Sequence, residues 1–465
     1  MRAKLRACKL RDEAGDGRTG VVYRSVFPDP NGRPLLQSMW VGDRLVTAPR
    51  ELGTAALDHM ASLSAADQWN SVAYDEADFS STVFPEGSGW AGHCRASKLL
   101  LEAFHSYDWG AHRGEFDQAF HAPSFAEFLA EIGRGSADSS AGITGIGYGH
   151  LKVFPRRLQK LFHKLVQVVV VHGVVPDGLV DLIIVALPKG SAQVGGVQGC
   201  RPISLYEVTL KVATGIVHRR MQKIIAAHAL LHDRQIFNVR NRGVHDALQF
   251  VLGAISRSIN AHQPVFMAST DVKGAFPSVP MWLLRYILRG KGASEQVVRF
   301  YTMADSSGKF CMRIGGGYSE FRARAVIGLG QGEKGSPEKY CIVIDPLLRY
   351  LANFKEFGLD IGPLRQLHLP SEAIPIVIDD RLVAVLFCDD MFLVSGTSDG
   401  LQMLLWKAGE VYDFSGARQV AYKSYAGSSK PLPPATVVLP CAGMDEIRLR
   451  SVVLQWAQEH LLGGT

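Results

Sequence analysis

The sequence predicts an α+β protein, because amphipathic helical patterns alternate with short apolar strand patterns that are joined by turns. Residues 374–396 read as a three-strand meander, with the apolar runs IPIVI, LVAVLF and MFLVS, and residues 206–231 read as one long helix with basic residues on one face. The chain has 465 residues, of which 47% are hydrophobic and 20% are charged. This composition supports a substantial core and excludes global disorder.

The other expected elements follow from the same periodicities. Residues 1–90, rich in Gly, Pro, Asp and Ser, show no sustained pattern and are expected to be irregular. Two helical patterns come next, at 94–107 and 123–133, the second with a start signal at Pro123–Ser124, and then a Gly-rich linker. The remaining expected elements are helices at 151–171, 245–259, 280–288, 337–353 and 400–414, strands at 182–187 and 264–270, and a hairpin over 311–326.

Several classes of protein are excluded by simple features of the chain. The start, MRAKLRACKLRDE, lacks the apolar stretch of a secretory signal, and the longest apolar run, Leu165–Pro188, is interrupted by polar residues and makes a poor membrane span. Seven scattered cysteines without a C-x-x-C spacing argue against a disulfide scaffold or a zinc knuckle. We therefore expect an intracellular protein of the nucleus or cytoplasm with reduced thiols.

Positive charge is concentrated in one part of the chain. The whole sequence has a net charge of +6, but residues 151–260 hold 15 Lys and Arg against five acidic residues, a net charge of +10. The other 355 residues therefore sum to −4. Clustered Lys and Arg are expected of a protein that binds a phosphate backbone, although helices with solvated basic faces produce the same bias. Charge alone leaves both interpretations open.

Three acidic positions follow runs of strand-forming apolar residues. Asp271 follows VFMAST, and Asp389–Asp390 lie between VAVLFC and MFLVS. Carboxylates at strand ends are hard oxygen ligands of the kind that a pair of Mg²⁺ ions needs for in-line phosphoryl transfer. An Asp-Asp pair is also an ordinary hairpin turn, as Asp379–Asp380 illustrate. Because the two turns of an antiparallel meander lie at opposite sheet ends, at most one pair can meet Asp271.

Five short motifs stand in a recognisable order. They are IIVALPKG with RPISL, then STDVKGAFPSV, GLGQGEKGSP, FCDD and FSGARQVAYKS. With these motifs the segment from about Gly142 to Lys423, roughly 280 of 465 residues, resembles the reverse transcriptase domain of non-LTR retrotransposons. Each motif is weak by itself, but five in the family's order are specific. The order favours Asp389–Asp390 over Asp379–Asp380, because the helix and the SG…K string follow the former pair.

The resemblance implies a right-hand polymerase palm, an antiparallel sheet backed by helices, with fingers and with a thumb that is missing or truncated. It implies RNA-directed DNA synthesis, in which deoxynucleotides are added to a primer 3′-hydroxyl by two-metal phosphoryl transfer. Asp271 and Asp389 would bind two Mg²⁺ ions, or Mn²⁺, with Asp390 as the supporting carboxylate and the Val272 carbonyl as a further ligand. The implied partners are an RNA template, a DNA or RNA primer and deoxynucleoside triphosphates.

Other motif residues carry implied contacts to the substrates. Lys189 and Arg201 would hold the triphosphate from the fingers, where the planar guanidinium suits bidentate phosphate binding. Gln331–Gly332 would place main chain against the template–primer base pair, since glycine lacks a Cβ and permits close approach. Lys423 would donate a proton to pyrophosphate. For each of these cations, a solvated surface position is the plain alternative.

Phe276 lies five residues after Asp271, where related RNA-dependent RNA polymerases carry an acidic residue that accepts the ribose 2′-hydroxyl. An aromatic ring at this position excludes that hydroxyl and favours deoxynucleotides, so an RNA-dependent RNA polymerase is the weaker polymerase interpretation. The plain alternative is that Phe276 is an ordinary core residue.

The match has departures from the family pattern. Cys388 replaces the usual small residue before the aspartates, Glu333 replaces Asp in the QGD string, and Gly274 stands where Lys is common. About 40 residues follow Lys423 and show no convincing thumb.

We therefore divide the chain into an N-terminal region of unknown role (1–135), fingers and palm (136–427) and a short C-terminal tail (428–465). A catalytically inactive, domesticated or fragmentary element protein that binds nucleic acid is the alternative from a different functional class. The sequence leaves the oligomeric state open.

Overall fold

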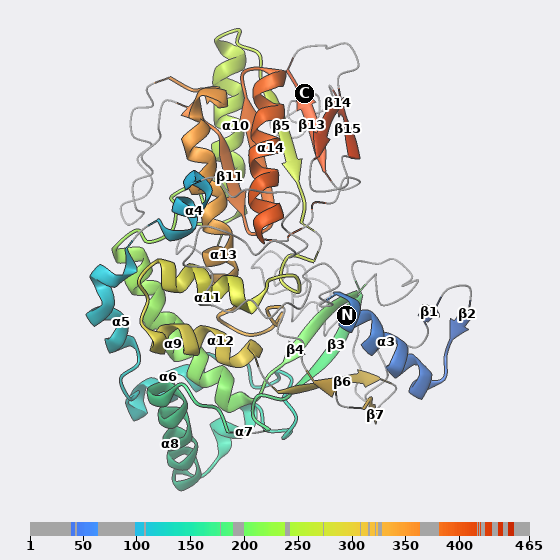
Figure 1. Ribbon diagram of the computed structural model, residues 1–465. Helices are drawn as coiled ribbons and strands as arrows, with labels where there is room; N and C mark the ends of the chain where they lie inside the picture. The colour runs from blue at the N-terminus through green and yellow to red at the C-terminus, as the bar shows by residue number, and fades with distance from the viewer. Residues whose placement is uncertain are drawn as a thin grey trace, which may run out of the picture. The chain divides into compact units, whose positions relative to one another are not determined.

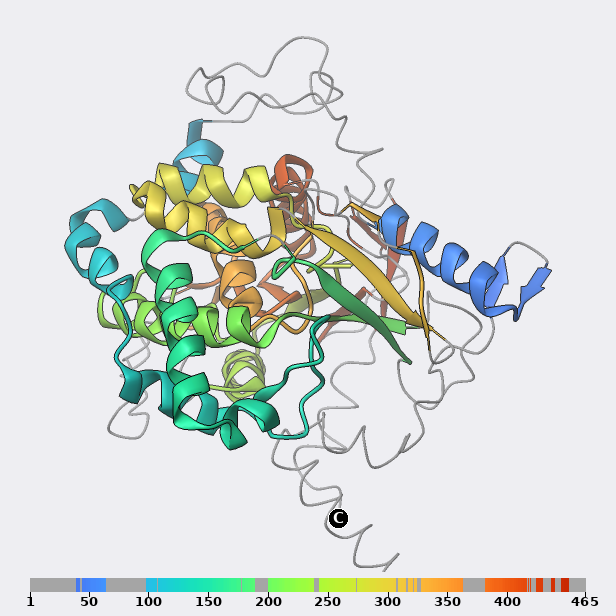
Figure 2. The same cartoon turned by 90° about the horizontal axis from the view of Figure 1, so that it is seen from below.

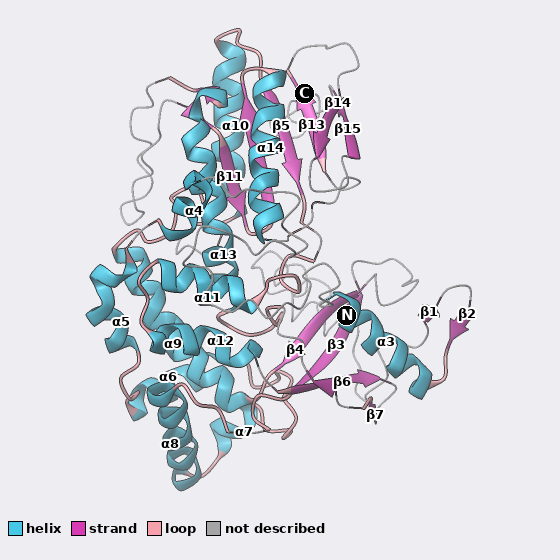
Figure 3. Cartoon of the chain, viewed as in Figure 1, coloured by secondary structure: helices cyan, strands magenta, loops and turns pink. Residues whose placement is uncertain are grey.

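The computed structural model describes most of the chain between residues 39 and 450 (Figures 1 and 3). The described ranges are 39–63, 98–188, 200–237, 242–314, 317–323, 328–362, 381–429, 436–439 and 445–450, with short gaps inside several of them. They divide into two compact units. The smaller unit is drawn from Met1–Met60, Ile183–Ile203 and Cys311–Arg322, and the larger unit from the remaining residues.

The smaller unit is built on a short sheet in the order β4-β3-β6-β7, with β8 (Arg322–Ala323) also pairing with β6. Its strands are β3 (Leu182–Pro188), β4 (Cys200–Leu205), β6 (Lys309–Ile314) and β7 (Gly317–Tyr318). The expected hairpin is confirmed, because β6 and β7 pair antiparallel with Ile314 opposite Gly317.

The expectation that residues 1–90 are irregular or loosely packed is wrong where the structure describes two short strands and one helix. Strands β1 (Met39–Val41) and β2 (Arg44–Val46) form an antiparallel pair, and α3 spans Pro49–Leu63. Leu52, Ala56 and Leu57 of α3 are buried. The spacing of four residues between Leu52 and Ala56 is helical, but the surrounding Gly and Pro hide it in a wide window.

The larger unit contains a six-stranded sheet in the order β11-β12-β5-β13-β15-β14. The strands are β5 (Phe266–Thr270), β11 (Ala384–Phe387), β12 (Asp390–Ser395), β13 (Tyr425–Ser428), β14 (Thr436–Leu439) and β15 (Asp445–Arg450). The expected strand before Asp271 and the strand pair around Asp389–Asp390 are confirmed. Strands β14 and β15, which lie beyond residue 428, extend the sheet and were not expected.

Two helices cover opposite faces of this sheet, as Figure 1 shows: α10 (Val244–Asn260) and α14 (Ser398–Ser415). Val394 of β12 packs in one buried cluster with Val251 of α10. Met391, an odd number of residues away and therefore on the other face, has its Sδ 4.0 Å from the Tyr412 hydroxyl of α14. Strand β12 therefore packs against a helix on each of its faces.

The remaining helices of the larger unit include α9, against which α5, α6 and α8 pack (Figure 2). They are α4 (Lys98–His105), η3 (Trp109–His112), α5 (Arg113–Ala119), α6 (Phe125–Arg134), α7 (Tyr148–Val153), α8 (Arg156–His172), α9 (Val208–Ala227), α11 (Met281–Gly290), α12 (Glu295–Ser306), α13 (Ser336–Leu351) and η5 (Ala352–Phe357). Among the described helices of this group, η3, α5 and α12 were not expected from the sequence. No helix of the described residues is long and apolar enough to cross a bilayer.

The single helix expected over 151–171 is two helices, so this expectation is wrong. The break falls at Phe154, whose φ of −61° and ψ of 142° are extended, directly before Pro155. Proline disfavours the helical conformation in the residue before it and cannot donate the helical hydrogen bond. The predicted start of α6 is confirmed, because Ser124 and Glu127 form a capping box.

The first strand of the expected meander, IPIVI at 374–378, lies outside the described residues, as do Asp379–Asp380. After them, β10 (Arg381–Leu382) pairs with β9 (Leu359–Asp360) in a separate two-stranded sheet.

Candidate functional site

Asp389 lies in a tight hairpin turn at one end of the large sheet. The hairpin joins β11 to β12 with Phe387 opposite Asp390, so Cys388 and Asp389 are its two central residues. Cys388 has a φ of 61°, the left-handed conformation that a type II′ turn requires at its first central residue. This turn leaves Asp389 half-buried and Asp390 exposed at the sheet end.

The register of the sheet brings Asp271 to the same end. Strands β5 and β12 pair antiparallel with Thr270 opposite Met391. Asp271 follows Thr270, and Asp390 precedes Met391, so the two aspartates flank the last pair of the ladder. Asp271 and Asp390 are far apart in sequence but neighbours across two adjacent strands.

The main chain around Asp271 is held on its other side by residues that follow α14. The Asp271 N–H donates a 3.5 Å hydrogen bond to Ser424 Oγ, and Val272 forms an antiparallel bridge with Gln419. Val272 is buried, whereas Asp271 is half-buried. The backbone at this strand end is therefore fixed by neighbours on both sides.

The donors at this sheet end have the chemistry of a hard-cation site. Asp271, Asp389 and Asp390 supply carboxylates, and Val272 supplies a main-chain carbonyl; oxygen donors of this kind suit Mg²⁺. Within the described residues, the one group of three His, Cys, Asp or Glu whose ligand atoms all lie within 4.8 Å of one another does not include these aspartates. The donor set fits the cation, and the role of each aspartate as a ligand stays a prediction.

Phe276 packs beside this sheet end. Its ring stacks on Tyr340 of α13, with ring centroids 5.0 Å apart and planes inclined by 21°. Burial raises the pKa of Tyr340 well above its ordinary value, and the neighbouring Tyr412 and Asp389 raise it further. Tyr340 therefore contacts Phe276 through its ring, and the charge of Asp389 contributes to the rise in the pKa of its hydroxyl.

The glycine-rich segment at 328–335 is hydrogen-bonded to the turn that contains Phe276. The Leu329 N–H donates to the Phe276 carbonyl over 2.8 Å, and the Gly328 N–H donates to the Val279 carbonyl over 2.7 Å. Gly328 has a φ of 104°, and a Cβ there would lie 2.8 Å from the Pro277 carbonyl oxygen. Only glycine fits this close approach.

Gln331 and Gly332 lie at the tip of the same segment. The Gln331 carbonyl accepts a 2.6 Å hydrogen bond from the Ser204 N–H, which fixes one side of the segment. Gly332 is exposed and has a φ of 122°. At Gly330 a Cβ would overlap the Tyr206 hydroxyl. Sterics therefore explain why this segment is rich in glycine.

A network of buried polar side chains holds the glycine-rich segment in place. Asp305 accepts hydrogen bonds from the Tyr206 hydroxyl (2.8 Å) and from Lys339 Nζ (2.7 Å), and Lys339 Nζ lies 3.3 Å from Glu333. The Ser336 hydroxyl donates to Glu333 over 3.1 Å. Burial alone would lower the pKa of Lys339, but Asp305 and Glu333 outweigh it and raise that pKa. Glu333, where the sequence departs from the family pattern, is thus a buried partner of Lys339.

A second buried carboxylate, Glu338, lies in the first turn of α13. It accepts a short hydrogen bond from the Tyr301 hydroxyl, and its Oε2 lies 3.1 Å from His218 Nδ1 of α9. Burial alone would lower the pKa of His218, but Glu338 raises it above its ordinary value. Glu338 therefore links the start of α13 to α9 through the ion pair with His218 and to α12 through the hydrogen bond from Tyr301.

Of the three predicted basic residues, the structure describes Arg201 alone. Arg201 is exposed on β4 in the smaller unit, and Lys189 and Lys423 lie outside the described residues. Their predicted contacts with the triphosphate and pyrophosphate stay predictions.

The sequence reasoning missed the supporting residues Tyr206, Asp305 and Lys339. Tyr206 directly follows RPISL, and Lys339 comes two residues after the end of GLGQGEKGSP, so motif proximity was a usable signal for both. Asp305 stands in no motif. Its role depends on contacts with residues 34 and 99 positions away, which no local pattern reveals.

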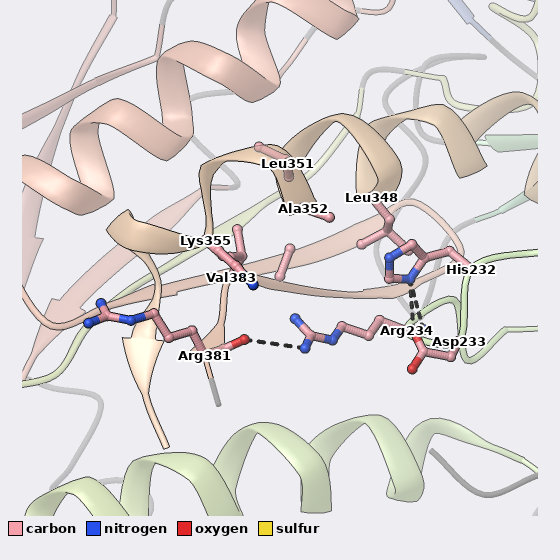
Figure 4. Close-up of a pocket in the computed structure, with 10 residues that line it drawn as sticks. His232, Asp233, Arg234, Leu348, Leu351, Ala352, Lys355, Arg381 and Val383 are labelled. Atoms are coloured by element: carbon pink, nitrogen blue, oxygen red, sulfur yellow. Dashed lines mark hydrogen bonds and ion pairs between the residues drawn. The ribbon is translucent and has the colours of Figure 1, made fainter. Parts of the chain in front are cut away.

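A cavity of about 170 Å³ lies near the other end of β11, where Ala384 lines it (Figure 4). Polar side chains that line it form ion pairs and hydrogen bonds with other residues of the protein. His232 Nδ1 lies 3.0 Å from Asp233, the Arg234 guanidinium donates to the Arg381 carbonyl over 3.3 Å, and Arg381 in turn donates to the Glu356 carbonyl. This cavity is a weaker candidate for chemistry than the sheet end that carries Asp271, Asp389 and Asp390, which we call the aspartate edge.

Comparisons with known proteins identify a family for the region that contains most of these motifs. Residues 187–418 match the family described as reverse transcriptase (RNA-dependent DNA polymerase). The chain is 24% identical over 249 residues to the retrovirus-related Pol polyprotein from type-1 retrotransposable element R2 of Nasonia vitripennis, an alignment that covers 53% of this chain. The chain spans only 22% of the length of that relative. A solved structure of apo telomerase from Candida tropicalis, truncated from its C-terminal domain, aligns with a TM-score of 0.39 and 12% identity over 59% of this chain and 56% of that one.

Proposed function

The chain carries a reverse transcriptase domain of the non-LTR retrotransposon type, and we propose that this domain extends a primer by RNA-templated addition of deoxynucleotides. One observation carries the proposal. Asp271 and Asp390 flank the Thr270–Met391 pair at one end of an antiparallel sheet, with Asp389 in the adjoining turn. Three carboxylates on neighbouring strands are suited to two-metal phosphoryl transfer.

Asp271, Asp389 and the carbonyl of Val272 would hold two Mg²⁺ ions, with Asp390 as the supporting carboxylate. The ions supply Lewis-acid stabilisation of the attacking and leaving oxygens when bound. The rigid support of Asp271 by β12 on one side and Ser424 on the other favours this role, because a positioned ligand needs little reorganisation.

Other residues would act on the substrates directly. Phe276 would exclude a ribose 2′-hydroxyl, and the main chain of Gln331–Gly332 would lie against the template–primer base pair. Arg201 and Lys189 would hold the triphosphate, and Lys423 would protonate the pyrophosphate leaving group. The stacking of Phe276 on Tyr340 supports its part of this proposal, because the contact holds the ring in one position.

The proposed domain limits are fingers and palm over 136–427, between an N-terminal region (1–135) and a C-terminal tail (428–465). Because the chain corresponds to about a fifth of the R2 relative, strand transfer into a target site is not part of the proposed activity of this chain.

Primer extension on poly(rA)–oligo(dT) with Mg²⁺ tests the proposal. We expect the Asp389→Asn variant to lose synthesis by at least about 100-fold, because an amide is a poor ligand for a hard cation. Asp399→Asn, at an exposed aspartate in the first turn of α14, is the matched control and should retain activity.

The alternative is a nucleic-acid-binding protein without catalysis, which the +10 segment favours. If neither the wild type nor Asp399→Asn extends the primer, while both bind RNA in a salt-sensitive way, the binding function holds and the polymerase proposal fails.

A further inference from the structure

Two histidines and one glutamate converge on the surface of the larger unit, on elements that carry none of the aspartates. His112 ends η3, Glu115 lies in the first turn of α5, and His228 follows the last residue of α9. The helical spacing of three residues sets His112 and Glu115 on one face. The end of α9 brings His228 to them from 113 residues away.

The three ligand atoms are already close together. His228 Nε2 lies 2.9 Å from Glu115 Oε1, His112 Nδ1 lies 3.5 Å from the same oxygen, and the atoms of all three residues fall within 4.8 Å of one another. Donors bound to one tetrahedral Zn²⁺ at about 2.0–2.1 Å are separated by roughly 3.3 Å. The observed separations bracket that value, so small side-chain movements would complete a site.

The two imidazoles lie against each other beside Glu115. Their rings stack with centroids 3.6 Å apart and planes inclined by 22°. The cluster is therefore compact, because the two rings contact each other and each contacts the carboxylate of Glu115.

The donor set also indicates which metal it suits. Imidazole nitrogens and one carboxylate are ligands of Zn²⁺ and similar first-row transition metals rather than of Mg²⁺. Both histidine side chains are 27% exposed and Glu115 is 49% exposed, so an ion can reach them from solvent. Water would fill the remaining coordination position.

We propose that His112, Glu115 and His228 form a binding site for Zn²⁺ or a similar divalent transition metal. The bound ion would join the η3–α5 segment to the end of α9 and stabilise the packing of the N-terminal helices. The site is independent of the aspartate edge and of the proposed polymerase function.

Zinc binding by the full chain tests the proposal. Titration with Zn²⁺ in the presence of excess Mg²⁺, which occupies hard oxygen sites, should show a site in the wild type that His112→Gln and His228→Gln each weaken by about tenfold or more. His121→Gln, at an exposed histidine near the end of α5, is the matched control and should bind as the wild type does. Zn²⁺ should also raise the Tm of the wild type and of His121→Gln but not of the double variant His112→Gln/His228→Gln.

Cobalt gives a second readout that does not depend on stability. Co²⁺ should produce visible d–d absorption in the wild type that is lost in the double variant. Equal zinc affinity and equal cobalt spectra in the double variant and in His121→Gln would overturn the proposal and leave the cluster as an ion pair. The variant Asp389→Asn should keep the zinc site, so failure of the polymerase proposal is distinguishable from failure of this one.

Discussion

Phe276 is held in place by contacts on two sides. Its ring stacks on the buried Tyr340, and its carbonyl accepts a hydrogen bond from Leu329 in the glycine-rich segment. An aromatic side chain fixed in this way presents a rigid surface. A rigid surface can discriminate against a substrate that carries one additional hydroxyl.

We expect Phe276→Ala to increase ribonucleotide incorporation relative to deoxynucleotide incorporation by about tenfold, because the smaller side chain opens space for the 2′-hydroxyl. Competitive primer extension with matched ribo- and deoxynucleotides measures this ratio. Phe154→Ala, at the junction of α7 and α8, is the control for loss of a phenyl ring. An unchanged ratio in an active Phe276→Ala enzyme would contradict the gating role.

Two departures from the family pattern have structural reasons at single residues. Gly274 has a φ of 58°, which disfavours the lysine that is common there. Cys388 is buried, and burial together with the carboxylate of Asp389 raises the pKa of its thiol, so the thiol stays protonated at neutral pH. The hairpin therefore tolerates a cysteine, although its φ of 61° is unusual for a residue with a Cβ.

Among the elements, α13 concentrates the buried charge. Asp345 on this helix is fully buried, with its carboxylate 3.3 Å from Lys291 Nζ and 2.5 Å from Arg349 Nε. It also accepts the His232 N–H over 2.6 Å. Burial alone would raise the pKa of Asp345, but Arg349 and Lys291 lower it, so it is ionised at neutral pH.

We expect Asp345→Asn to lower the free energy of unfolding by about 3–5 kcal/mol, because it leaves buried cations without their counter-charge. Lys291 is fully buried, so water cannot solvate its charge in place of Asp345. Urea unfolding of the wild type, Asp345→Asn and the exposed control Glu356→Gln measures the effect. A decrease below about 1 kcal/mol would show that the cations reorganise.

The contact between α9 and α13 predicts a dependence of stability on pH. The pKa of His218 is raised in the folded state by Glu338, so the folded protein binds more protons than the unfolded chain. The stabilisation is therefore complete below the ordinary pKa of about 6.5 and is lost as the pH rises through the raised value.

We expect the Tm difference between wild type and His218→Gln to be larger at pH 6 than at pH 8.5. Thermal unfolding at both pH values measures it. His121→Gln, whose histidine is exposed, controls for the loss of an imidazole. A pH-independent difference would mean that packing, rather than charge, accounts for the contribution of His218 to stability.

At the scale of the whole molecule, the net charge of +6 is the sum of a +10 segment and a −4 remainder. The segment includes α8, on which Arg157, Lys160 and Lys164 are exposed at helical spacing. Exposed cations on one helix face are available to a phosphate backbone.

We expect RNA affinity to fall by about 100-fold between 50 and 200 mM salt if about five phosphates are bound. Replacing Arg157, Lys160 and Lys164 together by Gln should make the slope of log affinity against log salt shallower by about 0.7 for each phosphate that these cations neutralise. Fluorescence anisotropy with a single-stranded RNA measures both quantities.

The charge-matched control replaces three exposed arginines outside the basic face of α8 by Gln: Arg113, Arg134 and Arg299. Equal slopes for the two triple variants would show that binding follows total charge and not the basic segment.

The sequence by itself determined the elements whose signals are local. Strand β5, the β11–β12 hairpin and helices α9, α10, α13 and α14 were predictable because apolar periodicity and turn residues act over a few positions. The order of five motifs identified the family for the same reason. Pro155 is a local signal too, because this proline, and not the apolar periodicity, sets the break between α7 and α8.

The tertiary structure alone decided which distant residues meet. The register that sets Asp271 beside Asp390, the pairing of Asp305 with Lys339 and Tyr206, and the addition of β14 and β15 to the sheet all join segments far apart in the chain. Such contacts depend on burial and on pairing between strands, which no short window of sequence contains. The residues proposed for catalysis could therefore be named from the sequence, whereas their support and the separate His112–Glu115–His228 cluster required the fold.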